Sequence, residues 1–389
     1  MRSFAAPLAI AACLSVRAAE KPFPDVPGVV IAHSPAASGI FIGSPSLAVL
    51  PNGDYAASHD EFGPESSEHT AAVSHVFRSQ DRGASWRRIA TVRGQFWSTL
   101  FVQRGDLYLL GTDRHHGNAV IRRSRDGGAT WTTPATAATG LIRGDGEYHC
   151  APVPVLEHAG RLWRAMEWRH PPVGWGVNYR AGMLSAPAGA DLLDAAQWTV
   201  SEFLPSDQSW NGGDFNAWLE GNAVVAPDGA LLNVLRVQTR SPDEKAALVR
   251  VAADGKSLAF DPAEGFAAFP GGAKKFAIRA DPQTKLYFAL ATIVHESCRA
   301  PNPGAIRNTL ALTSSPDLKT WTVRRVLLHH PDVAKHGFQY PDWHFDGEDI
   351  IAVVRTAYDD GLGGARNNHD ANFMTFHRFA DFRRPLPSD

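Results

Sequence analysis

Acids, histidines, arginines and a tyrosine recur where short apolar segments of the chain begin or end. Carboxylates and histidines carry protons near neutral pH, and a tyrosine becomes a nucleophile when a neighbouring carboxylate takes its proton. The residues best suited to such chemistry are Asp60, Glu220, Tyr340, His59 and His149. The residues best suited to holding a substrate are Arg236, Arg279, Arg355, His116, Asn222 and Asp342. Together they could bind a charged group and move a proton beside it, provided that the fold brings them together.

The segments that must position these residues form six copies of one pattern. In each copy a polar or small residue leads a short apolar strand, a tight turn follows, and a second apolar strand ends in a polar cluster. The copies cover residues 42–60, 96–113, 149–167, 218–237, 274–292 and 340–356, and their turns lie at Gly53, Gly105, Gly160, Gly229, Thr284 and Gly347. Glycine at such a turn indicates a hairpin, because it accepts the positive φ that tight turns need. Each copy is therefore interpreted as the inner hairpin of a four-stranded unit.

The spacing of these hairpins predicts the architecture. Successive turns are separated by roughly 50 to 70 residues, which is the length of one four-stranded propeller blade. We therefore predict an all-β, six-bladed β-propeller, with room for a weak seventh blade in the irregular stretch 238–272. Segments 29–33 and 372–379 should together complete the last blade. Inner strands surround the axis of a propeller, so the polar residues at their ends should face one shared cavity.

Outer hairpins carry a second signature, S-x-D-x-G-x-x-W. It occurs at residues 79–86 and 124–131, and a shortened copy occurs at 315–321. We expect its Asp to accept backbone N–H groups, its Gly to adopt a strained dihedral and its Trp to pack between blades. The signature matches the Asp-box of bacterial neuraminidase (BNR) repeats, and it argues for the fold rather than for a reaction.

The fold, the Asp-boxes and the order of polar residues resemble the sialidase superfamily. The residues that occur in the order of sialidase functional residues are Asp60, Glu220, Arg236 and Tyr340. Arg279 or Arg355 is available as a further arginine. The resemblance implies a glycoside hydrolase in which Asp60 is the general acid and Tyr340, paired with Glu220, is the nucleophile.

The sequence departs from the sialidase pattern at Gly43. Residues 41–46 read FIGSPS and place this glycine where sialidases have their first arginine, and residues 22–76 contain no arginine. A sialic acid carboxylate is normally held by three guanidinium groups, whose planar bidentate geometry a glycine cannot replace. We therefore expect little or no sialidase activity.

Several segments resemble a neighbouring branch of the superfamily, the rhamnosidases, rhamnosyl-glucuronate lyases and ulvan lyases. They are residues 58–70, 113–117, 147–155 and 367–378. The first reading is an exo-acting hydrolase for a terminal sugar that is acidic or linked to a uronate. The alternative is a polysaccharide lyase, in which Arg236 or Arg355 neutralises a uronate and a base removes its C5 proton. The candidate bases are His59, His116, His149 and Tyr340. A sugar-binding propeller without catalysis is the third reading.

The chain as a whole has 389 residues and a formal net charge of −2, and it lacks the basic patch of a nucleic-acid binder.

Residues 1–19 read as a secretory signal, which predicts a secreted or periplasmic protein, with lipid anchoring at Cys13 as an alternative. Residues 20–389 should form one propeller domain without a membrane span. We expect a glycan as partner and no metal or cofactor. The remaining thiols, Cys150 and Cys298, could pair or stay free.

Overall fold

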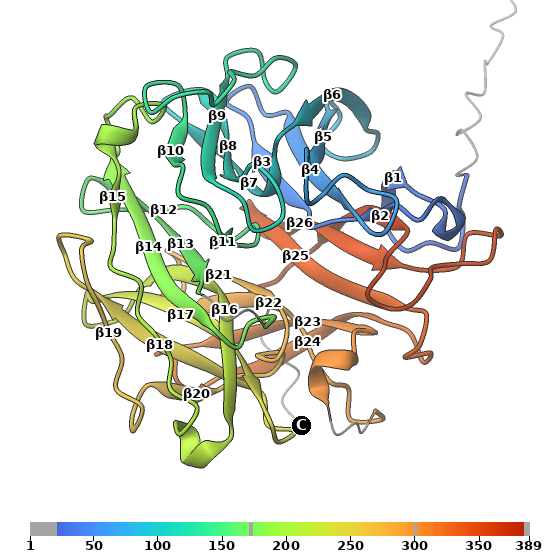
Figure 1. Ribbon diagram of the computed structural model, residues 1–389. Coiled ribbons are helices and arrows are strands. Elements are labelled where there is room, and N and C mark those ends of the chain that lie inside the picture. The colour runs from blue at the N-terminus through green and yellow to red at the C-terminus, as the bar shows by residue number, and fades with distance from the viewer. Residues whose placement is uncertain (1–21, 171–173, 299–301, 385–389) are drawn as a thin grey trace, which may run out of the picture.

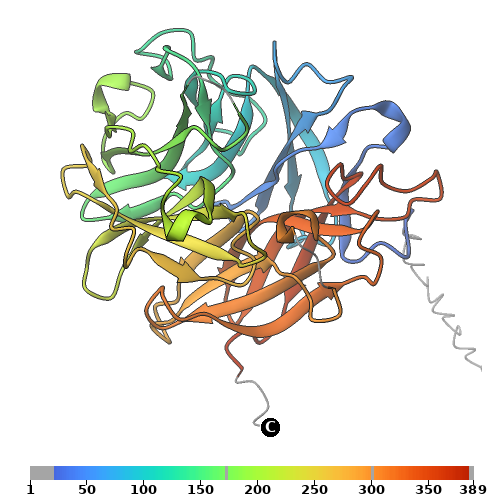
Figure 2. The ribbon, with the colours of Figure 1, turned by 60° about the horizontal axis from the view of Figure 1, so that its bottom comes forward.

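The computed structural model describes residues 22–170, 174–298 and 302–384. Six antiparallel sheets surround a central axis (Figure 1), and they radiate from it as separate blades (Figure 2). The described helices are short 3₁₀ turns at Ala36–Ser38, Ala195–Gln197, Asn211–Gly213 and Pro303–Ala305. This confirms the predicted all-β, six-bladed propeller. Part of the stretch 238–272 forms strands β18, β19 and β20 of the fourth blade, and no seventh sheet forms among the described residues.

The first three blades follow one another in chain order. The first contains β2 (Phe41–Ile42), β3 (Ser46–Val49), β4 (Tyr55–Phe62), β5 (Val73–Ser79) and β6 (Arg87–Arg93). The second contains β7 (Phe96–Gln103), β8 (Asp106–Thr112), β9 (Ala119–Ser124) and β10 (Leu141–Arg143). The third contains β11 (Tyr148–His149), β12 (Leu156–His158), β13 (Arg161–Arg169), β14 (Tyr179–Pro187) and β15 (Thr199–Val200). In the first and third blades the innermost strand is therefore interrupted.

The remaining three blades complete the circle. The fourth contains β16 (Phe215–Val225), β17 (Leu231–Thr239), β18 (Lys245–Val251), β19 (Leu258–Ala259) and β20 (Phe266–Ala268). The fifth contains β21 (Phe276–Ala280), β22 (Tyr287–Thr292), β23 (Thr309–Ser315) and β24 (Thr322–His329). The sixth contains β25 (Gly337–Asp346), β26 (Asp349–Ala357), β27 (Phe373–Phe379) and β1 (Val29–His33).

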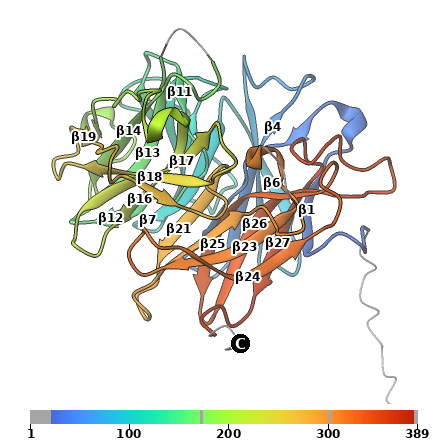
Figure 3. The same ribbon diagram turned by 90° about the horizontal axis from the view of Figure 1, so that it is seen from below.

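The last blade is closed by the beginning of the described chain. Strand β1 pairs antiparallel with β27, with Val29 opposite Phe376 and His33 opposite Phe373. Figure 3 shows β1 beside β27, β26 and β25 in this order. The prediction that segments 29–33 and 372–379 complete one blade is confirmed.

The hydrophobic core lies between neighbouring blades. One cluster joins Phe288 and Leu290 of the fifth blade to Phe338, Trp343 and Ile350 of the sixth. The middle strands are covered on both faces, so β26 reads as a nearly continuous buried run rather than an alternating one. Burial between sheets thus holds each blade to the next, and apolar area removed from water stabilises the ring.

The three turns that carry the Asp-box pattern have the expected hydrogen bonds. In the first, Ser85 N–H donates to Asp81 at 2.9 Å, Gly83 has φ 93°, and Trp86 Nε1 donates to the Gly83 carbonyl. The ring of Trp86 lies 5.5 Å from Phe376 in the adjacent blade. In the shortened copy Leu318 takes the glycine position with φ 65°. These turns pack the blades together at the outer hairpins and lie outside the cavity described below.

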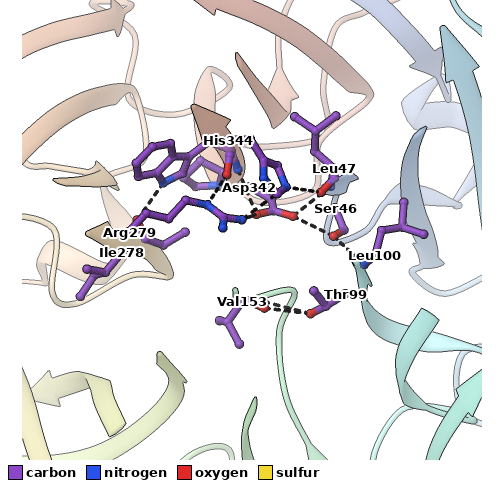
Figure 4. Close-up of polar contacts among 12 residues, drawn as sticks. Ser46, Leu47, Thr99, Leu100, Val153, Ile278, Arg279, Asp342 and His344 are labelled. Carbon is purple, nitrogen blue, oxygen red and sulfur yellow. Dashed lines mark hydrogen bonds and ion pairs between the residues drawn. The ribbon is translucent and has the colours of Figure 1, made fainter. Parts of the chain in front are cut away.

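Side chains on the innermost strands also tie each blade to the next (Figure 4). Asp342 accepts hydrogen bonds from Ser46 Oγ and Leu47 N, and Ser46 Oγ accepts one from Leu100 N. Thr99, the neighbour of Leu100 on β7, exchanges hydrogen bonds with the backbone of Val153 in the third blade. These contacts fix the relative positions of the inner strands, on which the candidate site is built.

Two further expectations concern cysteines and membranes. Cys150 is buried, Cys298 is half-buried, and both are free. The predicted signal segment, including Cys13, lies outside the described residues. Within the described part of the chain no helix is long and apolar enough to cross a bilayer.

Candidate active site

A cavity of about 350 Å³ lies where the inner strands of several blades converge. It is lined by residues from the strands or loops of all six blades: Gly43, Ser44, Phe62, Glu68, Phe96, Trp97, His115, Trp175, Arg236, Arg307, Tyr340, Arg355 and His369. One side of this set is cationic and the other is aromatic. A concave site with a few converging polar groups is the usual form of a small-molecule site.

The backbone of three inner strands is bent where it meets this cavity. Trp97, Glu220 and Tyr340 have φ values of 48°, 57° and 52°, and each lies in a register shift of its strand pair. A bulge with a left-handed residue re-aims a side chain, and such strain costs about 1 to 3 kcal/mol that packing must offset. Strain at the same place in three blades indicates that these side chains have a shared task.

The cationic side of the cavity consists of three guanidinium groups, those of Arg236, Arg307 and Arg355. Arg236 forms a 2.8 Å ion pair with Glu220. Arg307 donates to Gln339 Oε1 at 2.7 Å, and Arg355 donates to the His369 carbonyl. Within the described residues neither Arg307 nor Arg355 has an ion-pair partner. Burial lowers the pKa of Arg307 to about 10, so this group stays cationic at neutral pH without a counter-ion.

Tyr340 lies among these groups. The guanidinium carbon of Arg355 lies 4.7 Å from the centre of the tyrosine ring. Burial alone would lower the pKa of Arg236, but Glu220 and the Tyr340 hydroxyl raise it above its ordinary value. Burial alone would raise the pKa of Glu220, yet Arg236 and other cations hold it below its usual range. Glu220 is thus an ionised carboxylate, and Arg236 interacts with both Glu220 and the Tyr340 hydroxyl.

Asp60 lies directly behind the cavity wall that Gly43 and Trp97 form. Its Oδ2 atom accepts the Trp97 N–H at 2.8 Å. Its Oδ1 atom lies 2.6 Å from Ser74 Oγ, which is also 2.8 Å from the Gln95 carbonyl. A hydroxyl has one hydrogen, so both contacts are satisfied when a protonated Asp60 donates to Ser74 and Ser74 donates to Gln95. Burial raises the pKa of Asp60 to about 7, which fits this arrangement.

Glu68 is a second acid at the cavity, and it lines the wall itself. It comes from the loop after β4, where its Oε1 atom accepts a long hydrogen bond from Gly63 N. Burial raises the pKa of Glu68. Two carboxyl groups with raised pKa values therefore belong to this part of the site: Glu68 lines the cavity and Asp60 lies behind its wall.

The aromatic side of the cavity is formed by Trp97, His115 and Trp175. The rings of Trp97 and His115 lie 4.5 Å apart, and Trp175 is 46% exposed. Burial lowers the pKa of His115 to about 3, so its imidazole is neutral at physiological pH. Flat, partly exposed rings beside cationic groups suit the apolar face of a sugar ring.

A buried histidine network supports this wall from behind. His149 Nδ1 lies 2.8 Å from Glu167 Oε2, and the same carboxylate accepts the Gly221 N–H. His116 Nε2 lies 2.5 Å from the Tyr179 hydroxyl. His116 and His149, which were predicted to act on substrate, are therefore held behind Trp97 and Trp175 and do not line the cavity.

A second cavity of about 440 Å³ adjoins the first. The two share Trp175, Arg236 and Arg307. The further lining of the second cavity is mostly polar: Asn216, Gln238, Thr239, Arg240, Ala273, Asn302, Pro303 and Gly304. The two cavities therefore meet at Trp175, Arg236 and Arg307.

The structure brings five of the predicted residues together at the first cavity. Arg236, Arg355 and Tyr340 line it, and Asp60 and Glu220 lie immediately behind its wall.

His59 lies elsewhere, because its position on β4 turns the ring away from the axis. It lines a separate cavity with Glu61 and His75, and its Nδ1 atom contacts the Asp60 carbonyl.

Arg279, Asn222 and Asp342 hold the blades together instead of facing the cavity. Arg279 donates to the Trp343 carbonyl and lies 3.6 Å from Asp342 (Figure 4). Asn222 accepts the Ile278 N–H at 3.0 Å. Asn222 and Asp342 come two residues after the bulged Glu220 and Tyr340, and this offset turns them toward the next blade. The sequence pattern alone could not separate these two directions.

Arg307 is the main site residue that the sequence reasoning missed. It precedes β23 and therefore lies outside the inner hairpins, whose ends supplied the predicted site residues. Its place in the chain, after Arg236 and before Tyr340, is where the sialidase pattern has its third arginine, so the order of residues was a usable signal. Glu68, His115 and His369 were missed for a similar reason, because they lie in connecting loops.

Comparisons with solved structures identify the fold. An α-L-arabinanase of Penicillium chrysogenum, solved with arabinobiose, is 15% identical over 92% of this chain and 99% of its own, with a TM-score of 0.57. The Hadza microbial sialidase Hz136 is 12% identical over 92% and 69%, with a TM-score of 0.62. The GH93 α-L-arabinofuranosidase of Fusarium graminearum, solved with arabinobiose, is 11% identical over 90% and 97%, with a TM-score of 0.54.

The chain therefore has the sialidase-like six-bladed propeller fold, which these glycoside hydrolases share. No protein-family description matches the sequence, and no curated protein matches it. The likeness rests on the fold, and the function must be argued from the site.

Proposed function

We propose that this protein is an exo-acting glycoside hydrolase that cleaves a terminal sugar carrying, or linked to, a carboxylate. The observation that carries the proposal is the pair of buried guanidinium groups, Arg307 and Arg355, which face the cavity without a counter-ion. An unpaired buried charge is costly, and an anionic ligand removes that cost. The identities of the structural neighbours, a sialidase, an arabinanase and an arabinofuranosidase, support glycoside cleavage.

The proposed reaction uses Tyr340 as nucleophile. Glu220 takes the phenolic proton, and Tyr340 attacks the anomeric carbon, while Arg236 stabilises the charge on the pair. Asp60, whose pKa is raised by burial to about 7, is partly protonated at neutral pH and is assigned as the general acid for the leaving oxygen. Glu68, which lines the cavity, is the second candidate for that role. Water then cleaves the glycosyl-tyrosine bond with the acid now acting as base.

The carboxylate of the substrate is assigned to Arg236, Arg307 and Arg355. The expectation of little sialidase activity rested on the missing arginine at position 43. The cavity nevertheless contains three guanidinium groups, because Arg355 comes in from the sixth blade. Lack of a third guanidinium is therefore not an argument against an acidic sugar here, and the remaining walls decide which one fits.

Elimination from a uronate is the second candidate, and one observation favours it. His115 lines the cavity on the side facing the arginines, and it is neutral at physiological pH because burial lowers its pKa to about 3. An unprotonated imidazole has a lone pair that can accept a C5 proton, but a pKa of about 3 makes it a weak base, so elimination stays the second candidate. In this case Tyr340 would protonate the leaving oxygen.

A screen of released products on purified glycans tests the proposal. Hydrolysis gives a reducing sugar without ultraviolet absorbance. General-base elimination leaves an unsaturated uronate, in which the double bond conjugated with the carboxylate absorbs at ~230 nm. Binding without any product would identify a lectin-like propeller. Release of neutral sugars alone, with no preference for a carboxylate, would contradict the assigned role of the arginines.

A further inference from the structure

A cluster of two histidines and an aspartate lies outside the two cavities, in the loop that joins β24 to β25. One ligand atom each from His330, Asp332 and His336 lies within 4.8 Å of the others. His336 is 5% exposed, and its Nδ1 atom lies 2.8 Å from Asp332 Oδ2. A carboxylate oxygen of Asp359, from the loop after β26, lies 3.5 Å from His336 Nε2.

The hydrogen bonding of His336 leaves one atom unexplained. When its Nδ1–H donates to Asp332, the neutral ring has a lone pair on Nε2. This Nε2 atom is buried and has no hydrogen-bond partner among the described residues. Its lone pair faces the carboxylate of Asp359, and two acceptors at this distance repel. The buried Nε2 atom is therefore an unsatisfied acceptor that a bound cation can use.

A second imidazole of the cluster lies against the first. The imidazoles of His330 and His336 are stacked with centres 3.5 Å apart and planes 15° apart. Parallel rings do not point their nitrogen atoms at one ion, so one of the two rings must turn when an ion binds. His330 Nδ1 makes only a 3.1 Å contact with Asp332 N–H, which an ion can replace.

We propose that His330, Asp332 and His336 bind a divalent transition-metal ion of the zinc class. Two imidazoles and one carboxylate are ligands that Zn²⁺ accepts in a tetrahedral site, with the fourth position open to a further oxygen ligand. Such a site has its ligand atoms about 3.3 Å apart, from metal-ligand distances of about 2.0 to 2.1 Å. The ligand atoms, which lie within 4.8 Å of one another, must therefore close in by up to about 1.5 Å. The half-buried position of Asp332 leaves room for this movement.

The position of this cluster gives the ion a structural task. Asn368 donates to the carbonyls of Val333 and Ala305, and its N–H donates to Ala334. The next residue, His369, lines the first cavity. Arg307 is held nearby, because its carbonyl accepts the Phe338 N–H. An ion in the β24–β25 loop would thus stiffen the segments that carry two cavity residues.

The test uses the full-length protein without a histidine tag, treated with a chelator and then dialysed. Zn²⁺ is titrated by calorimetry, bound metal is counted by mass spectrometry, and the melting temperature is measured with and without Zn²⁺. We expect one equivalent of bound Zn²⁺ and a rise in melting temperature. In His336→Ala and Asp332→Asn, at least a tenfold loss of affinity is expected. His329→Ala is the matched control, since His329 is the neighbouring residue and contacts Thr309 outside the cluster.

Two outcomes would overturn the proposal. One is the absence of stoichiometric metal together with an unchanged melting temperature in Zn²⁺, which would leave a proton shared by His336 and Asp359. The other is equal Zn²⁺ affinity in the wild type and in a folded Asp332→Asn, which would place the ion elsewhere. Co²⁺ gives a third measurement: its visible absorption should appear in the wild type and in His329→Ala, and be lost in His336→Ala.

Discussion

The guanidinium carbon of Arg355 lies 4.7 Å from the ring centre of Tyr340 and 4.5 Å from that of Phe62. A cation over aromatic faces is stabilised by the ring quadrupoles, and at a desolvated site the gain is about 2 kcal/mol. These contacts hold the charge of Arg355 at the cavity without an ion-pair partner, so its hydrogen-bonding capacity remains available to a ligand.

Arg307 gives the sharpest test of an acidic substrate. We expect Arg307→Ala to reduce kcat/KM by a factor that corresponds to about 2 to 5 kcal/mol, and Arg307→Lys to restore part of it, since a point charge lacks the planar fork. The measurement compares the acidic substrate with its methyl ester, on which the variants should differ little from wild type. Arg250→Ala, at an exposed pair with Asp228, is the control. Equal losses on acid and ester would show a role in folding rather than recognition.

Tyr340→Phe isolates the phenolic oxygen. The ring that packs under Arg355 is kept, so stability should change by less than about 1 kcal/mol, while kcat should fall by about 10² to 10⁴ if the hydroxyl is the nucleophile. Steady-state rates and thermal unfolding measure the two effects. Tyr287→Phe, which loses a hydroxyl bonded to the Val225 carbonyl at the outer side of the fifth blade, should keep full activity. Wild-type turnover in Tyr340→Phe would contradict the role of Tyr340 as nucleophile and would favour His115 as the reacting residue.

The raised pKa of Asp60 predicts how the stability of the protein depends on pH. Its pKa of about 7 in the folded protein exceeds the ordinary 3.8, so the stability that the neutral carboxyl contributes is present below about pH 4 and is lost as pH rises through 7. Asp60→Asn stays neutral and keeps an acceptor for Trp97 N–H. Its stability relative to wild type should therefore increase between pH 4 and 7, by on the order of a few kcal/mol, in thermal unfolding measured across this range.

The same residue should limit activity on the alkaline side. If Asp60 supplies the proton, kcat/KM falls above about pH 7 in the wild type, and Asp60→Asn is inactive on substrates with poor leaving groups. Glu68→Gln is the comparison. If it removes the alkaline limb and Asp60→Asn does not, Glu68 is the acid.

Gly43 tests the close approach of backbone to Asp60. A Cβ atom built at position 43 would lie 2.5 Å from the Asp60 carbonyl oxygen and 2.8 Å from its Cβ. Gly43→Ala should therefore destabilise the fold by about 1 to 3 kcal/mol, as overpacking does, and should lower kcat by displacing the acid. Gly189→Ala is the control, because a Cβ there meets nothing within 4 Å. Unchanged stability in Gly43→Ala would mean that the strand pair can shift freely.

The sequence predicted the fold well because its signals are local and repeated. Hairpin glycines and Asp-box turns depend on neighbouring residues, and six copies reinforce one another. The site was predicted less completely. Arg236, Tyr340 and Arg355 line one cavity and Asp60 and Glu220 lie behind its wall, but the direction of an inner-strand side chain depends on a bulge. Only two residues separate a cavity residue such as Tyr340 from a blade-tying residue such as Asp342, and hydrophobic periodicity does not report the bulge between them.

The hairpin pattern of the sequence did not identify the site residues in loops, for a different reason. Arg307, Glu68 and His369 are placed by contacts with segments far away in the chain, such as Gln339 for Arg307. The same holds for His330, Asp332 and His336, whose grouping depends on how the β24–β25 loop turns back on itself. The spacing of residues along the sequence does not predict such contacts between distant segments.

The pairing of β1 with β27 has a consequence for when this protein can fold during its synthesis. The partner of Val29 is Phe376, so the ring cannot close until nearly the whole chain has left the ribosome. Contacts of such long sequence separation are slow to form, because the loop between them must first be ordered. Until then β1 has no partner strand and the sixth blade stays incomplete. A chain built this way remains unclosed for most of its translation.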